Sequence, residues 1–143
     1  MNLKNKIPQL LIGAFLVAGG AVFVSKIFSS PGGAMIVDVK VPALSDMAKD
    51  GKKAFDANCV ACHGANASGS EKGPPLIHNY YNPGHHADQA FYLAAKRGVQ
   101  MHHWQFGNMP PQPQINEREM AKVIQYVREL QRANGIFYRQ HQM

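Results

Sequence analysis

The sequence contains one short stretch, Cys59-Val60-Ala61-Cys62-His63, that constrains the fold more than any other feature. Two thiols three residues apart lie on one side of a helical turn. From there they can add to the two vinyl groups of a single haem, while the adjacent His63 can reach the iron. The pattern therefore predicts a covalently attached haem with His63 as its proximal ligand.

Three other interpretations of the two cysteines are open at this point. A thiol redox pair has the same spacing, but its neighbours should form a strand–helix redox fold, which the sequence does not indicate. A structural zinc site needs four closing ligands, whereas this chain has only two cysteines. A disulfide between Cys59 and Cys62 would leave His63 without a role. Haem attachment is the interpretation that uses all three residues.

The amino-terminal part of the chain is apolar and carries no charged residue from Ile7 to Ser25. At about 1.5 Å per residue, a helix of this length spans roughly the hydrocarbon core of a bilayer. Two lysines precede the run, and this charge bias predicts a cytoplasmic amino terminus with the rest of the chain exported. We expect residues 1–28 to form a membrane anchor, 29–44 a flexible linker, and 45–143 the haem domain.

A cleavable signal peptide is the alternative interpretation of the first segment. The small residues Ala18-Gly19-Gly20 resemble a cleavage site, but the apolar run continues beyond them and exceeds a usual signal core. Both interpretations export the haem domain.

Helical signals recur through residues 45–143. Ser45 with Asp46 is typical of a helix start, and Asp88 is expected to cap a helix that stops at Gly98. The last predicted helix begins at a capping-box-like pair, ends before Gly135 and carries an apolar stripe. The pair is Asn116 and Glu119, and the stripe is Met120, Val123, Ile124, Val127 and Leu130.

Gly51, Phe55, Cys59, Cys62 and His63 follow the order G-x-x-x-F-x-x-x-C-x-x-C-H. This order resembles the opening of class I cytochromes c, and the resemblance extends over about residues 45–134. It implies an all-α fold of three to five helices around one haem c, bound through the two cysteines. In that family the glycine and the aromatic residue face the carboxy-terminal helix.

The segment Gly73-Pro74-Pro75-Leu76 is similar to the G-P-x-L element of the same family. The resemblance implies that the Pro74 carbonyl accepts a hydrogen bond from the second ring nitrogen of His63. Such a contact fixes the orientation of the imidazole and raises its basicity as a ligand. A rigid turn alone would also account for two adjacent prolines.

Gly107-Asn108-Met109-Pro110-Pro111 resembles the M-P segment that supplies the distal methionine in class I cytochromes c. The resemblance implies that Met109 is the sixth ligand of the iron. Met101 is the competing methionine, and the competing imidazoles are those of His78, His85, His86, His102 and His103.

Trp104, the only tryptophan, lies in the same predicted loop. In the family a tryptophan often donates to a haem propionate, which makes Trp104 a candidate for that role. A core-filling role is equally compatible with the sequence. Tyr80, Tyr81 and Asn82 are further candidates for the propionate edge.

The net charge of +6 is shared between residues 1–44 and the remainder, so the haem domain is only mildly basic. This balance argues against nucleic acid as a partner. The tail 136–143 extends beyond the resemblance, and we expect it either to fold back or to contact a partner.

The resemblance implies a one-electron carrier rather than an enzyme, working between quinol–cytochrome c reductase and a terminal oxidase. It would lie on the periplasmic side of a bacterial inner membrane. The alternative is a dedicated haem subunit of an oxidase or dehydrogenase complex. A haem sensor or peroxidase would require an open distal site.

Overall fold

The structure is a computed structural model that describes residues 35–140. The predicted all-α class is confirmed for these residues, whose only β pairing is an isolated antiparallel bridge between Val99 and Met109. The helices are α2 (Asp46–Asn58), α3 (Val60–His63), α4 (Asp88–Arg97) and α5 (Glu117–Ala133), with short 3-10 turns η2 (Ala65–Ala67) and η3 (Asn79–Tyr81).

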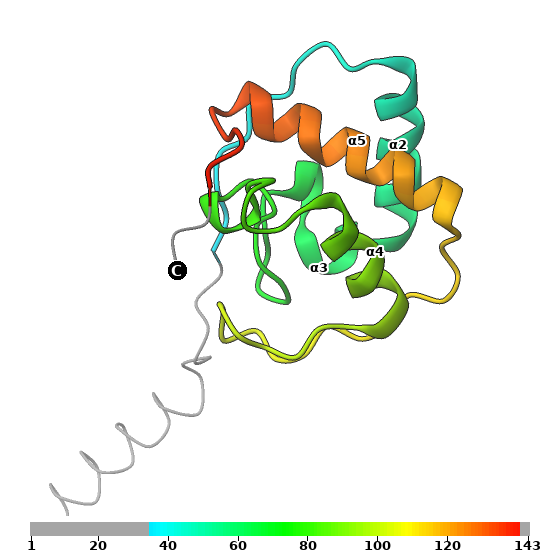
Figure 1. The fold of residues 1–143 in the computed structure, drawn as a ribbon, viewed down its shortest axis with the longest axis vertical. Helices are drawn as coiled ribbons and strands as arrows, with labels where there is room; N and C mark the ends of the chain where they lie inside the picture. Colours follow the sequence, from blue (N-terminus) through cyan, green and yellow to red (C-terminus); the bar gives the residue numbers. More distant parts are fainter. Residues whose placement is uncertain (1–34, 141–143) are drawn as a thin grey trace, which may run out of the picture. The chain divides into compact units, whose positions relative to one another are not determined.

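Helix α5 lies across α2, and this crossing forms the centre of the domain (Figure 1). Gly51 permits the close approach, because a Cβ atom there would lie only 1.9 Å from the carbonyl oxygen of Lys122. One turn further on, the rings of Phe55 and Tyr126 meet edge to face, with centroids 5.6 Å apart. The packing of Gly51 and Phe55 against the last helix therefore agrees with the expectation.

The helix ends follow the sequence signals with one exception. Ser45 caps α2 by accepting from the amide of Ala48, and Asn116 forms a reciprocal capping box with Glu119 at the start of α5. The prediction that Asp88 caps α4 is wrong. The cap position is Ala87, which has no side-chain acceptor, and Asp88 is the first helical residue.

The buried apolar side chains form one cluster, to which α5 contributes the expected stripe. Contacts from α2, α4 and the intervening loops complete this cluster. Its members are Ala48, Phe55, Ala67, Leu76, Ile77, Phe91, Ala95, Met120, Val123, Ile124, Tyr126, Val127, Leu130 and Ile136.

Residues 35–44 are extended and attached to the domain. The amide of Val37 donates to Ser68 (2.9 Å), and Lys40 exchanges two hydrogen bonds with the side chain of Asn134. Within this described part of the predicted linker over 29–44, Val37, Val39 and Leu44 have apolar side chains that pack on the core. The bounds of the linker stay a prediction.

The predicted anchor, residues 1–28, lies outside the described residues. Among residues 35–140, no helix has both the length and the apolar character needed to cross a bilayer.

At the other end, residues 136–140 fold back onto the domain. Ile136 is buried, and the amide of Arg139 donates to the side chain of Asn82 at 3.3 Å. Of the two expectations for the tail, folding back therefore applies to this described part.

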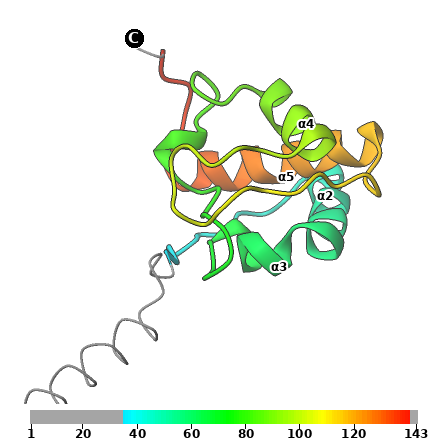
Figure 2. The same cartoon turned by 90° about the horizontal axis from the view of Figure 1, so that it is seen from below.

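The long loop between α4 and α5 extends away from the helices and doubles back (Figure 2). Val99 and Met109 pair across it through two backbone hydrogen bonds of 3.0 Å. Farther along, the amide of Gln112 donates to the carbonyl of Ala95 at 2.7 Å, which ties the returning part of the loop to α4.

Candidate haem site

A cavity of about 410 Å³ opens within the domain. The six residues that the sequence predicts to bind or position the haem all contribute to its wall, although they come from three separate parts of the chain. They are Cys59, Cys62, His63, Pro74, Trp104 and Met109. The remaining wall is mainly apolar and includes Phe55, Leu76, Phe91, Val99, Met120 and Val123.

Helix α3 brings the two cysteines to the same side of the chain. The amides of Cys62 and His63 both donate to the carbonyl of Cys59, at 3.2 and 2.9 Å, and so close a single helical turn. Both cysteines are free thiols, Cys59 half-buried and Cys62 exposed. Burial, followed by the neighbouring Cys62, raises the pKa of the Cys59 thiol to about 11. The pair thus has the spacing that covalent attachment requires.

The imidazole of His63 is held by the carbonyl of Pro74. Its Nδ1 lies 2.9 Å from that oxygen, and since a carbonyl can only accept, Nδ1 carries the proton. The other nitrogen, Nε2, is left with its lone pair for a metal. Burial lowers the pKa of His63, partly opposed by the Pro74 contact, so the neutral form is favoured. This is the hydrogen bond that the family resemblance implied.

The loop that carries Pro74 wraps closely around the end of α3. The Ser70 hydroxyl donates to the Cys62 carbonyl (2.5 Å), and the Gly69 amide donates to the His63 carbonyl (2.7 Å). Gly73 also passes near this turn, since a Cβ there would lie 2.9 Å from the Cys62 oxygen. These short-range contacts fix the position of Pro74 relative to His63.

Both candidate methionines line the cavity but differ in their surroundings. Met109 is half-buried and is held by its backbone pairing with Val99. Met101 is 42% exposed, and its amide donates to the Asn108 side chain at 2.9 Å. Met109 is thus the more enclosed thioether.

Trp104 donates its indole N–H to the hydroxyl of Tyr81 at 3.1 Å. Tyr81 lines the cavity, whereas Tyr80 and Asn82 do not contribute to its wall. Burial raises the pKa of Tyr81 to about 12, although the hydrogen bond from Trp104 acts in the opposite direction. The propionate role of Trp104 stays a prediction, and the contact with Tyr81 is an additional feature.

The sequence reasoning missed two polar residues on α5, Arg128 and Gln131, which are both buried. Arg128 pairs with Asp88 (2.8 Å) and donates to the carbonyls of Tyr81 (2.7 Å) and His86 (2.6 Å). Gln131 donates to the carbonyl of Leu76 at 2.9 Å. Their spacing was the available signal, because each follows an apolar stripe residue by four positions and so faces the core.

This arrangement fits a haem. The apolar wall matches the macrocycle, and the two thiols and one oriented imidazole are the groups that covalent attachment and proximal ligation require. Thioethers are present elsewhere on the same wall. The site chemistry and the helical fold therefore agree.

The family model for cytochrome c matches residues 48–131. The chain therefore belongs to the cytochrome c family, and it carries covalently attached haem c as a haem-based electron-transfer protein of the class I type. Searches among curated proteins and among solved structures gave no match.

Proposed function

We propose that this protein is a one-electron carrier whose iron is ligated by His63 and Met109. When bound, the haem supplies a reversible couple between ferric and ferrous iron. The observation that carries the proposal is the 2.9 Å contact between His63 Nδ1 and Pro74, which leaves Nε2 available to the metal. A thioether as the second ligand favours ferrous iron more than a second imidazole would, and so raises the reduction potential.

The wall of the cavity supports transfer rather than catalysis at the iron. Apolar side chains on both α4 and α5 line it and limit the access of water. If His63 and Met109 both held the iron, oxygen and peroxide would have no coordination site. A change of one electron then requires little rearrangement of the surrounding residues.

The choice between the methionines gives the decisive experiment. Ferric wild type should show the weak red charge-transfer band of methionine sulfur on iron, and Met109→Ala should abolish it. The same variant should have a lower potential and should bind carbon monoxide when reduced.

Met101→Ala is the matched control, because Met101 lies in the same loop and on the same cavity wall. It should leave the band, the potential and the ligand access nearly unchanged. If Met101→Ala removes the band and Met109→Ala keeps it, the axial assignment is wrong. A wild type without the band that binds carbon monoxide readily would favour a sensor or peroxidase.

We further propose that electrons pass from quinol–cytochrome c reductase to a terminal oxidase. The apolar run Ile7 to Ser25 supports an anchor in a bacterial inner membrane, with the haem domain on the periplasmic side. Tethering of this kind raises the effective concentration of the carrier near its partners without a tight interface.

A dedicated haem subunit of an oxidase or dehydrogenase complex is the second candidate. The observation that favours it is the exposed aromatic pair in the tail, Phe137 (57% exposed) and Tyr138 (69% exposed). Side chains of this kind are enriched at protein interfaces.

Membrane fractionation tests the proposed anchor and distinguishes the shuttle from the fixed subunit. The protein should stay with the membrane through carbonate washing, and after mild detergent extraction it should migrate apart from the respiratory complexes. Constant co-purification with one complex would replace the shuttle with the fixed subunit. A soluble product that starts near Ala21 would replace the anchor with a cleaved signal.

A further inference from the structure

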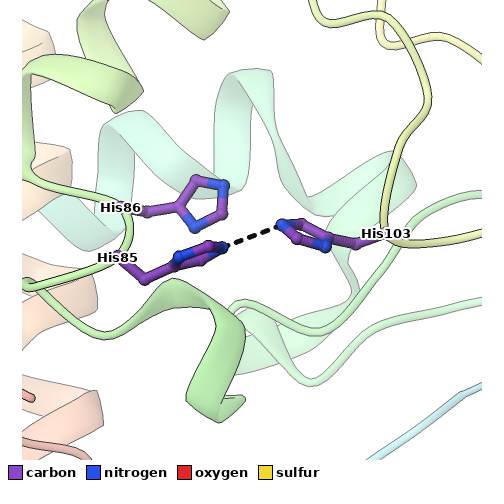
Figure 3. A group of neighbouring side chains, drawn as sticks. All are labelled: His85, His86 and His103. Carbon is purple, nitrogen blue, oxygen red and sulfur yellow. Dashed lines mark hydrogen bonds between the residues drawn. The ribbon is translucent and has the colours of Figure 1, made fainter. Parts of the chain in front are cut away.

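Three histidines outside the proposed axial ligation converge beside the haem cavity. We call His85, His86 and His103 the histidine cluster; each offers a ring nitrogen, and these nitrogens all lie within 4.8 Å of one another. Figure 3 shows the rings of His85 and His86 facing that of His103 across the cluster. The first two follow η3, whereas His103 comes from the loop after α4.

One contact within the cluster has nearly the dimensions of a metal site. The Nε2 atoms of His85 and His103 are 3.1 Å apart. Two imidazole nitrogens bound to one tetrahedral Zn²⁺ at about 2.0–2.1 Å lie roughly 3.3 Å from each other. The contact is a hydrogen bond, so one of the two nitrogens carries its proton. With that proton displaced by the metal, a shift of a few tenths of an ångström would let one ion accept a lone pair from each ring.

The backbone around the cluster orients its rings. The amides of His85 and His86 both donate to the carbonyl of Asn82, at 3.0 and 2.9 Å. His86 Nδ1 lies 2.5 Å from the carbonyl of Tyr80, which fixes its proton there and leaves Nε2 as the ligand atom. The ring of Tyr80 stacks on that of His103 with a centroid distance of 4.6 Å. Metal-binding histidines typically have an outer hydrogen bond of the kind that His86 makes.

We propose that the histidine cluster binds one divalent transition metal ion, Zn²⁺ or Cu²⁺, through three imidazole nitrogens. The group contains no carboxylate, and an all-nitrogen set suits these ions rather than Ca²⁺ or Mg²⁺. The fourth position is open to water or to His102, whose ring centroid lies 4.3 Å from that of His103.

The surroundings favour the neutral imidazoles that a metal requires. Burial lowers the pKa of His86 and of His103, and the neighbouring histidines lower both further. His86 and His103 also belong to the wall of the haem cavity, whereas His85 does not. His85 therefore allows the cluster to be changed without altering the haem wall.

The test uses the full-length holoprotein in detergent after treatment with a chelator. Calorimetric titration with ZnCl₂ should show one equivalent bound per chain, without a change in the visible haem spectrum. Loss of an outer hydrogen bond typically weakens metal binding 10–100-fold, so loss of a ligand in His85→Gln should weaken it about 100-fold or more.

His78→Gln is the matched control, since His78 stands in the same aromatic surroundings but outside the cluster. It should bind Zn²⁺ as wild type does. Equal affinity in wild type and His85→Gln would overturn the proposal, as would an equal loss in both variants.

Electron paramagnetic resonance with one equivalent of Cu²⁺ gives a second readout. The copper signal should show hyperfine coupling to three nitrogens in wild type, and to fewer in His85→Gln. A copper signal without nitrogen coupling, or a visible spectrum altered by the added ion, would contradict binding at the cluster.

Discussion

The two sides of the haem cavity are built in different ways. On the side of α3, the contacts join residues close in sequence, such as His63 with Pro74 and Ser70 with Cys62. On the side of the long loop, the support comes from far along the chain. Arg128 of α5 holds the carbonyls of Tyr81 and His86, and Tyr81 in turn accepts from Trp104.

This difference indicates that different contacts hold the two sides of the cavity in place. The α3 side consists of one helical turn and a wrapped loop, so its geometry is largely local, with Cys59 and Val60 only partly buried against the core. The loop side is held by a polar network that can exist without the haem. Removing the thiols that attach the haem and removing the network of Arg128 should therefore have separable effects on the stability of the domain.

The largest effect is expected from loss of both thiols. Cys59→Ala with Cys62→Ala should give no haem stain on a denaturing gel and little helical circular dichroism, because a domain of this size cannot replace the buried haem with other apolar contacts. Each single variant keeps one attachment point and should retain part of the stain. Haem that survives denaturation in the double variant would contradict covalent attachment through these residues.

An intermediate effect is expected from loss of the network. Arg128→Met should lower the free energy of unfolding of the holoprotein by about 2 to 4 kcal/mol, since buried acceptors without a donor cost about 1–3 kcal/mol each. Asp88 contributes little to this loss because its side chain is 63% exposed. Denaturant titration followed by the visible spectrum measures the change.

Arg132→Met is the matched control for that change, as Arg132 is an exposed arginine one turn further along α5. It should alter stability by less than about 0.5 kcal/mol. If the two variants lose equal stability, the network does not support the loop side, and the contrast between the two sides fails.

The same contrast explains what the sequence could and could not predict. The turn of Cys59 to His63 and the capping box at Asn116 depend on neighbours in sequence, and each followed from a short pattern. The approach of Gly51 to Lys122 joins distant parts of the chain, and it was expected only from the family resemblance. Arg128 and Gln131 are polar residues on a buried helix face, and apart from the hydrogen bond between them, their partners are 40 or more residues away. No local pattern identified their partners, because only the folded chain supplies the carbonyls that satisfy them.

The misassigned cap has a tertiary cause. Asp88 is a good cap residue by type, but its carboxylate pairs with Arg128, and Ala87 takes the cap position. The tertiary partner therefore overrode the local preference for a cap. Residues 35–44, in the predicted linker, also have a partner distant in sequence, because Lys40 hydrogen-bonds with Asn134.

The smallest effect is expected from two tyrosine hydroxyls, one for each side of the cavity. Tyr81 accepts from Trp104 on the loop side, and Tyr126 donates to Asn66 (3.2 Å) just after α3. Tyr81→Phe and Tyr126→Phe should each lower the free energy of unfolding by about 1 kcal/mol, the typical net value of one hydrogen bond.

Amide hydrogen exchange and the pH dependence of stability then test whether each variant loosens only its own side of the cavity or the whole domain. Exchange of the Val99 and Met109 amides should speed up only in Tyr81→Phe, and that of the Ala67 and Leu76 amides only in Tyr126→Phe. Burial raises the pKa of both hydroxyls from 10.0 to about 12. The folded state therefore binds the hydroxyl proton more tightly than the unfolded state does. The stability that this difference contributes is fully present below pH 10 and is lost between pH 10 and 12. Each variant should show a shallower loss of stability over that window than wild type. If both variants accelerate both pairs of amides equally, the two sides of the cavity are one cooperative unit rather than two separately held ones.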